Sequence, residues 1–538
     1  MTTDLEEAKL ELFLQWLQVN GAQLRGSKIK YCSHSKRFGI FKSKDVPDGV
    51  LLVVPLHLAI TPMRVLEDPL FGPECRSMFE EGEVDDRFLI MLFLTVERLR
   101  KNSSWKPYLD MLPNEFGNPL WFTDDELSEL KGTTLHKATE LQKKNLRSLF
   151  DEKVKKLAEK LLAHDGNSDS EVRFEDFLWA NSIFWTRALT IPLPRSFVFP
   201  RAQLEDEKAP KINESANQVT EVGPASQEGE TLWVEGLVPG IDFCNHDLKA
   251  AATWEVDGNG STTGVPYSMY LLSAGDLQAG KEISISYGNK GNEELLYLYG
   301  FVIENNPDDY LMIHYPMEAI PDLPFSETKV QLLEAQKGEL RCLLPRKLLD
   351  NGFFPECSSL EGTYNKRTNN ASSFNYSWSG QRKMPSYINK LVFPEDFLTS
   401  LRTITMKEKE LNRVSSLLEE LVGSEKERQP SETEVRTAVW EACGDSGALQ
   451  MLVDLLNMKM MELEEGSGTE ENDAELLEKA HIRETSNEER SFENKSECRY
   501  MSRNKWTSIV YRLGQKQLVR RFVGEAEQAL QLALSEDS

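Results

Sequence analysis

The sequence predicts an α+β fold in which a β-rich half carrying a helical insert precedes an all-helical half. Short strand-like runs separated by turns occupy residues 28–55 and return at 232–288. Apolar residues recur with helical spacing at 85–190 and again after about residue 312. A chain of 538 residues is longer than one hydrophobic core usually holds, so we expect two or three domains.

The N-terminal half begins with a helix, because residues 5–19 place Leu10, Phe13, Leu14 and Leu17 on one helical face. Alternating or continuous apolar runs predict strands at residues 28–34, 38–43, 50–55, 232–242, 251–258, 267–275 and 281–288. Helical periodicity predicts an insert of helices at about 85–195, and Thr123 is a candidate cap for one of them. A short helix is expected at 292–300.

Two segments read as disordered. Residues 202–231 are polar and almost without large apolar side chains, and residues 462–497 are acidic and of low complexity. We therefore expect a β-rich domain at 1–312 with a disordered insertion at 202–231, and a helical domain at 313–538 with an acidic disordered loop at 462–497.

The charge excludes several kinds of partner. The chain has 62 basic and 87 acidic side chains, a net charge of −25, and the two segments expected to be disordered carry 14 of those 25 excess negative charges. Binding to a nucleic-acid backbone or to an anionic membrane needs an excess of Lys and Arg, so neither is expected. No run of residues is long and apolar enough to span a bilayer.

The cysteines and the N-terminus bear on location. Seven cysteines are scattered without a C-x-x-C pair, which argues against disulfides and structural zinc and favours a reducing compartment. The first seven residues include three acids, unlike a signal or transit peptide. We therefore expect a monomer in the cytoplasm, the nucleus or both.

Two polar motifs stand out in apolar surroundings. Asp242, Asn245 and His246 lie in a tight loop directly after a strand, and a second strand some forty residues later ends at Tyr287. Taken alone, the loop could equally be a turn whose Asx side chains cap backbone groups. No G-x-S-x-G hydrolase motif or H-E-x-x-H metal motif accompanies it.

The order of these motifs resembles the C-terminal part of the SET domain of protein-lysine methyltransferases. The matching runs are IDFCNH at 241–246, ISISYG at 283–288 and NEELLYLYGF at 292–301. Residues 35–41 resemble the first strand turn of that domain. Residues 105–113 and 184–188 resemble the helical insert of the plant Rubisco large-subunit methyltransferase class, and residues 511–522 resemble its helical substrate-binding domain.

The resemblance implies a knotted cofactor loop, S-adenosyl-L-methionine as cofactor, no metal, and transfer of a methyl group to lysine in a protein substrate. It implies that the cofactor is bound by Lys36, Arg37, Phe38, Arg187, Asn245 and His246. It implies that the substrate channel is lined by Asp242, Trp254, Tyr287 and Tyr299, with Tyr287 catalytic. Trp254 replaces a tyrosine of the Rubisco enzyme, and Ile191 replaces an arginine near its substrate, so we do not expect Rubisco itself to be the substrate.

Three alternatives remain open. The same class includes an enzyme that methylates histidine in actin, so the acceptor could be histidine. A catalytically silent SET-like protein could use the helical half to hold a partner. A purely structural helical scaffold would leave the strand and loop motifs unexplained.

Overall fold

The computed structural model describes residues 2–32, 37–164, 166, 171–198, 231–275, 277–355, 377, 382–422, 428–486 and 501–537. The chain divides into two compact units. The N-terminal unit comprises Met1–Phe116 and Leu141–Asn289, and the C-terminal unit comprises Gly117–Glu140 and Lys290–Ser538.

This division differs from the expected boundary at 312. Residues 117–140, expected in the helical insert, and residues 290–312 both belong to the C-terminal unit. The reason is a close backbone approach: a Cβ atom on Gly117 would lie only 2.4 Å from the carbonyl oxygen of Gly300. Gly300 itself has φ of 76° and ends a helical turn, a conformation that glycine adopts without strain.

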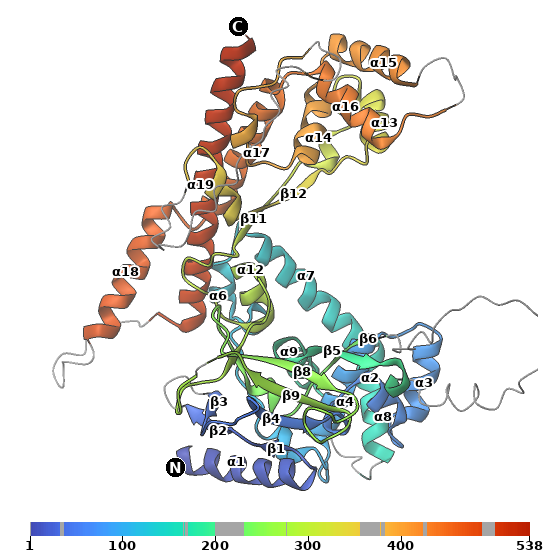
Figure 1. Ribbon diagram of the computed structural model, residues 1–538, viewed down its shortest axis with the longest axis vertical. Coiled ribbons are helices and arrows are strands. Elements are labelled where there is room, and N and C mark those ends of the chain that lie inside the picture. The colour runs from blue at the N-terminus through green and yellow to red at the C-terminus, as the bar shows by residue number, and fades with distance from the viewer. Residues whose placement is uncertain are drawn as a thin grey trace, which may run out of the picture. The chain divides into compact units, whose positions relative to one another are not determined.

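The N-terminal unit holds the expected strands, joined by the helices of the insert (Figure 1). Its strands are β1 (Gln23–Leu24), β2 (Ser27–Cys32), β3 (Arg37–Lys42), β4 (Val50–Pro55), β5 (Leu189–Pro194), β6 (Thr231–Gly236), β7 (Asn245–His246), β8 (Ala252–Asp257), β9 (Ser268–Ser273) and β10 (Ser284–Ile285). Its helices are α1 (Thr2–Val19), α2 (Pro62–Glu67), α3 (Gly72–Glu80), α4 (Asp86–Leu99), α5 (Lys106–Leu109), α8 (Lys155–His164), α9 (Phe174–Arg187) and α10 (Arg195–Val198). The division between the units falls within α7 (Thr134–Leu149).

The central sheet of this unit is antiparallel with the order β1-β4-β9-β8. Every residue of β4 is buried, as its continuous apolar sequence predicts for a strand with neighbours on both sides. Strand pairs β2–β3 and β5–β6 are antiparallel, whereas β7 and β10 pair in parallel. Helices α4 and α9 pack against each other, and their apolar faces are buried.

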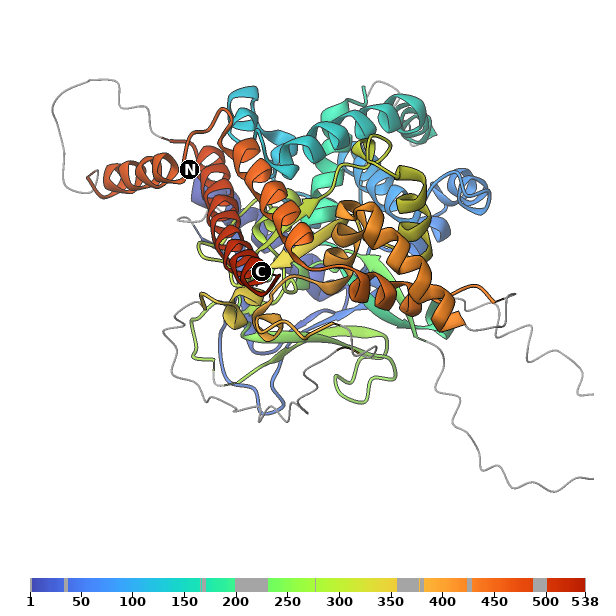
Figure 2. The same ribbon diagram turned by 90° about the horizontal axis from the view of Figure 1, so that it is seen from above.

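The C-terminal unit is mainly helical. It contains α6 (Asp124–Ser128), α12 (Asn292–Glu294), α13 (Ser326–Ala335), α14 (Glu395–Thr405), α15 (Glu408–Val422), α16 (Glu432–Ala442), α17 (Ser446–Glu464), α18 (Glu470–Ser486), α19 (Arg503–Asp537) and the antiparallel strands β11 (Tyr310–His314) and β12 (Arg341–Pro345). The long α19 runs beside α17 (Figures 1 and 2). Thr123 caps α6 as expected, in a reciprocal capping box with Glu126.

The expected disorder at 462–497 is wrong for residues 462–486, which include the end of α17 and all of α18. The acidic composition predicted disorder wrongly because α18 is stabilised by ion pairs with α19: the buried Asp473 pairs with Arg512 at 2.6 Å and with Lys516 at 2.7 Å. Residues 487–497 lie outside the described residues, as do residues 202–230 of the other segment, while Thr231 begins β6.

Neither unit offers a transmembrane helix: within the described residues, no helix is long and apolar enough to cross a bilayer. In the same part of the chain, no cluster of three or more His, Cys, Asp or Glu side chains could hold a metal ion.

Candidate active site

The expected site is organised by the turn at residues 240–246. Gly240 has φ of 103°, where a side chain would be strained, and the 3₁₀ turn Ile241–Phe243 follows it. β7 then pairs in parallel with β10, with Asn245 opposite Ser284 and His246 opposite Ile285. The two sequence motifs, separated by about forty residues, are therefore adjacent in the fold.

Asp242 is the buried anchor of this turn. Its side chain has no exposed surface and accepts hydrogen bonds from the hydroxyl of Tyr108 at 2.5 Å and from the backbone N–H of Gly240 at 3.1 Å. Burial raises the pKa of the Asp242 carboxyl, against the opposing effects of Arg187 and Tyr108. Burial and the nearby Asp242 also raise the pKa of Tyr108, so Tyr108 acts as a neutral donor.

Arg187 ends α9 beside this anchor. Its Nη1 donates to the backbone carbonyl of Asp242 at 2.8 Å and lies 3.8 Å from the Asp242 carboxylate. Its guanidinium lies over the Phe243 ring at 4.8 Å from the centroid, which fixes the plane of the group. The buried Nε of Arg187 has no hydrogen-bond partner among the described residues. An unsatisfied buried donor is costly, so this N–H is suited to a ligand.

Asn245 and His246 have side chains fixed by neighbouring groups. Asn245 donates from Nδ2 to the Glu282 carboxylate. The Nδ1 atom of His246 accepts from the backbone N–H of Tyr287 at 3.1 Å, and the two rings are 5.2 Å apart. An accepting Nδ1 assigns the proton of the neutral imidazole to Nε2.

Tyr287 lies two residues after the end of β10 and is half-buried. Its hydroxyl donates to the backbone carbonyl of Cys244 at 2.8 Å, which ties it to the same turn. Because that hydrogen bond uses the hydroxyl proton, the phenolic oxygen keeps lone pairs that can accept a hydrogen bond from a ligand amine.

Arg37 and Phe38 begin β3 at the edge of this cluster. Phe38 is buried and packs edge-on against Phe243 at 6.2 Å. The next residue is Gly39, where a Cβ atom would come within 3.2 Å of Asn245 Nδ2 and within 2.8 Å of Glu282 Oε1. β3 therefore approaches the turn as closely as its backbone allows. Lys36 lies outside the described residues.

Two expected substrate residues belong to other elements. Trp254 is half-buried in β8, opposite Leu271 of β9. Tyr299 belongs to the C-terminal unit, in the π-helical turn Leu295–Tyr299, and its ring lies 6.2 Å from that of Phe301. Burial and Glu294 raise the pKa of Tyr299 to about 12.

Sequence reasoning missed three residues that support this site. Tyr108 donates a hydrogen bond to Asp242, and Glu282 accepts one from Asn245. The ring of Phe243 lies under the guanidinium of Arg187. Phe243 lies inside the recognised motif, so only its role was missed. Tyr108 lies 134 residues before Asp242, and no local pattern marks that contact.

The chain is similar in sequence to several N-methyltransferases. The chain is 28% identical over 330 residues to the chloroplastic N-methyltransferase of the Rubisco large subunit from Pisum sativum, covering 61% of this chain and 58% of that protein. It is 28% identical over 336 residues to the chloroplastic fructose-bisphosphate aldolase-lysine N-methyltransferase from Arabidopsis thaliana, covering 60% and 58%. It is 26% identical over 305 residues to the human actin-histidine N-methyltransferase, covering 56% and 43%. No protein-family model matches the chain.

Solved structures extend the likeness to nearly the whole chain. The SET domain of LSMT bound to lysine and AdoHcy superposes with a TM-score of 0.60 at 20% identity, covering 97% of this chain and 92% of that one. Rubisco LSMT bound to AdoMet also gives a TM-score of 0.60, at 19% identity. The chain has the fold of these SET-domain structures. The expected resemblance is confirmed, although the chain spans only about 58% of the length of the plant relatives.

Proposed function

We propose that this chain is a protein-lysine N-methyltransferase that uses S-adenosyl-L-methionine. The observation that carries the proposal is the convergence of Arg187, Asn245, His246 and Tyr287 on one buried turn. This turn sits in a fold shared with structures bound to AdoMet, AdoHcy and lysine, and the relative from Arabidopsis thaliana is a lysine N-methyltransferase.

The residues present fit this cofactor. The guanidinium of Arg187 is a planar fork suited to a carboxylate, and its Nε has no partner among the described residues. Lys36, Arg37 and Phe38 would hold the cofactor through backbone groups, and Asn245 and His246 would bind its adenine. We also propose that the cofactor loop is knotted, as the resemblance implies. The cofactor supplies an electrophilic methyl group on a sulfonium.

The chain's own task is to present an uncharged amine in the right place. A free lysine side chain has a pKa of about 10.4 and is mostly charged, hence non-nucleophilic, at neutral pH. An aromatic channel disfavours the charged form and lowers that pKa. The Tyr287 oxygen, held by the Cys244 carbonyl, accepts from the amine and orients it. Such placement accounts for much of the rate of a two-substrate reaction.

We propose that Trp254, Tyr287 and Tyr299 line the lysine channel. We assign Asp242 a different part from the one expected, because its carboxylate has no exposed surface and touches Tyr108 and Gly240. Asp242 would act as a positioning residue that holds Arg187 through its backbone carbonyl.

The replacement Tyr287→Phe tests the catalytic assignment. It removes the hydroxyl and leaves the ring, so we expect methyl transfer to fall about a hundredfold while cofactor affinity stays nearly unchanged. Transfer is measured with labelled cofactor and fractionated cell extract, and affinity by calorimetric titration. The exposed Tyr267 provides a matched control, Tyr267→Phe, which should leave both unchanged. Full activity in Tyr287→Phe would show that the assigned role is wrong.

The actin-histidine relatives favour histidine as a second candidate acceptor. The pH profile separates the two candidates, because a free imidazole with a pKa of about 6.5 is already neutral at pH 8. A histidine acceptor predicts a rate that is flat between pH 7.5 and 9.5, whereas a lysine acceptor predicts a rate that keeps rising. Mass mapping of the methylated residue identifies the acceptor directly.

A catalytically silent binding protein is the remaining alternative, and absence of any calorimetric signal with S-adenosyl-L-methionine would favour it.

We further propose a monomer in the cytoplasm or nucleus that acts on a protein and not on nucleic acid or membranes, supported by the net charge of −25 and by five free cysteines among the described residues. Light scattering and a fluorescent fusion test these proposals.

A further inference from the structure

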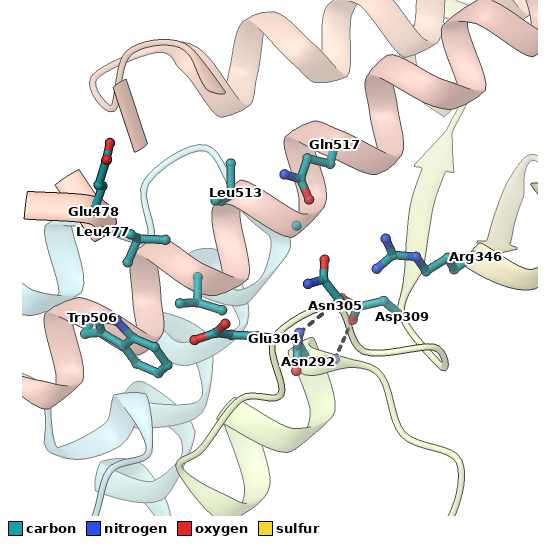
Figure 3. A pocket seen from close by; sticks show the side chains of 12 residues that line it. Asn292, Glu304, Asn305, Asp309, Arg346, Leu477, Glu478, Trp506, Leu513 and Gln517 are labelled. Carbon is teal, nitrogen blue, oxygen red and sulfur yellow. Dashed lines mark hydrogen bonds between the residues drawn. The ribbon is translucent and has the colours of Figure 1, made fainter. Parts of the chain in front are cut away.

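The C-terminal unit contains a cavity that no part of the proposed reaction uses. Its volume is about 480 Å³, and it lies among α18, α19 and the segments around residues 304 and 346 (Figure 3). It is lined by Asn292, Glu304, Asn305, Asp309, Arg346, Leu477, Glu478, Trp506, Val510, Leu513, Gly514 and Gln517. All of these residues belong to one unit, so the cavity is complete within it.

One end of the cavity is suited to a cation. Figure 3 shows the Glu304 side chain directed toward the Trp506 indole at this end, whereas the Glu478 carboxylate on α18 points away from both. Within the described part of the chain, neither the Glu304 nor the Glu478 carboxylate has a hydrogen-bond or ion-pair partner, and both side chains are exposed. An ammonium or guanidinium group between the Glu304 carboxylate and the Trp506 indole gains both an ion pair and a cation–π contact.

The other end of the cavity is already organised. The buried Asp309 accepts from the backbone N–H of Asn292 at 2.6 Å and from its Nδ2 at 3.1 Å. Burial raises the Asp309 pKa to about 6, with Arg346 and Asn292 opposing the rise, so the carboxylate is mostly ionised at neutral pH. Figure 3 places Arg346 beside Asp309 at this end. The lining therefore carries three acids against one base.

The walls between the two ends suit an extended protein segment. Leu477, Val510 and Leu513 offer apolar surface for the alkyl stem of a long side chain. Asn305 and Gln517 offer amide groups that can pair with a peptide backbone. A free metal ion or a small inorganic anion would leave most of these groups unused.

We propose that this cavity is a docking site for a partner protein segment that presents a lysine or arginine side chain. The cationic group lies between Glu304 and Trp506, with Glu478 adding negative charge to the lining of the same cavity, and the flanking backbone lies along Asn305 and Gln517. This inference does not rest on methyl transfer.

The test is calorimetric titration of the full-length chain, without cofactor, with a capped pentapeptide of sequence GAKAG. Two further probes are the same peptide with acetyl-lysine and the single residue Nα-acetyl-lysine amide. We expect the lysine peptide to bind and the acetyl-lysine peptide to bind at least about tenfold more weakly, because acetylation removes the charge.

Paired variants locate the binding. Glu304→Gln with Glu478→Gln should weaken the lysine peptide about tenfold. The control pair Glu318→Gln with Glu475→Gln removes the same charge from exposed positions outside the cavity, Glu475 being on the same helix as Glu478, and should bind like the unaltered chain. The cavity pair should still bind S-adenosyl-L-methionine, which shows that the protein is folded and keeps this test separate from the proposed reaction.

Four results would overturn the proposal. They are no binding of the lysine peptide at millimolar concentration, equal affinity for the acetylated peptide, equal affinity in the two variant pairs, or equal affinity for the single residue. The last result would assign the cavity to a small free amine. Weakening by Tyr287→Phe and not by the cavity pair would place the peptide in the proposed substrate channel.

Discussion

Each unit contains a buried aspartate that accepts a hydrogen bond from a tyrosine and faces arginine. In the C-terminal unit, Asp445 accepts from Tyr387 at 2.7 Å, from Arg382 at 2.7 Å and from Arg402 at 2.8 Å. The two guanidiniums and the tyrosine hold the pKa of Asp445 below its usual range despite burial. Each of the three guanidinium nitrogens of Arg402 has a hydrogen-bond partner among Asp445, Glu395 and Thr399.

In the N-terminal unit the same residue types are arranged less completely. Tyr108 donates to Asp242 at 2.5 Å, but the Asp242 carboxylate is 3.8 Å from Arg187, and burial leaves its pKa raised. Arg187 keeps a buried Nε with no partner among the described residues. The Asp445 network, in which the donors are paired, is a structural one. The Asp242 network is incomplete and retains hydrogen-bonding capacity for a ligand.

Removal of one arginine from each network should produce the largest difference. Arg402→Ala leaves Asp445 with one guanidinium fewer in a buried setting, so we expect it to cost about 3–5 kcal/mol of unfolding free energy. Arg187→Ala should cost only about 1–2 kcal/mol and weaken cofactor binding about tenfold or more. Urea unfolding, monitored by hydrogen exchange in α14 and α17, measures the unfolding free energy of each variant. Calorimetric titration with the cofactor measures its affinity. A similar stability cost for the two variants would remove the contrast between the networks.

Removal of the tyrosine hydroxyls gives an intermediate effect. Tyr108→Phe takes a donor from an under-paired carboxylate and should cost about 1–3 kcal/mol. It should also weaken cofactor binding about threefold, because Asp242 positions Arg187 through its carbonyl. Tyr387→Phe, the matched control, should cost less and leave cofactor binding unchanged, since Asp445 retains two guanidiniums. Unchanged cofactor affinity in Tyr108→Phe would argue against its positioning role.

The pH dependence of stability should differ in sign, with effects on the order of 1 kcal/mol. The lowered pKa of Asp445 means that its contribution is present above pH 3.8 and is lost as pH falls through its folded pKa. The raised pKa of Asp242 means that the cost of its buried charge is present at neutral pH and is relieved as pH falls toward 3.8. The stability cost of Asp445→Asn should therefore shrink below about pH 4. That of Asp242→Asn should grow between pH 7 and pH 4, and urea unfolding of both variants across this range checks the signs.

Most helices and strands were predicted from the sequence because neighbouring residues in the chain determine them. Thr123 caps α6 through Glu126 three residues later, and the buried strand Val50–Pro55 follows from an apolar run. The parallel pairing of β7 with β10, which sets Asn245 opposite Ser284, joins segments about forty residues apart and was not predicted from the sequence. The prediction of disorder for α18 failed because an acidic composition says nothing about Arg512 and Lys516 elsewhere in the chain.

By itself the sequence determined the class of fold, the order of its elements and the two motifs that form the candidate site. The tertiary structure decided which of those polar groups are buried, because burial depends on neighbours far along the chain. Tyr108 reaches Asp242 across 134 residues, and that contact holds the carboxylate in a buried position 3.8 Å from Arg187. The cavity at Trp506 likewise exists only because α18 and α19 pack together, an arrangement that depends on the buried pairing of Asp473 with Arg512 and Lys516.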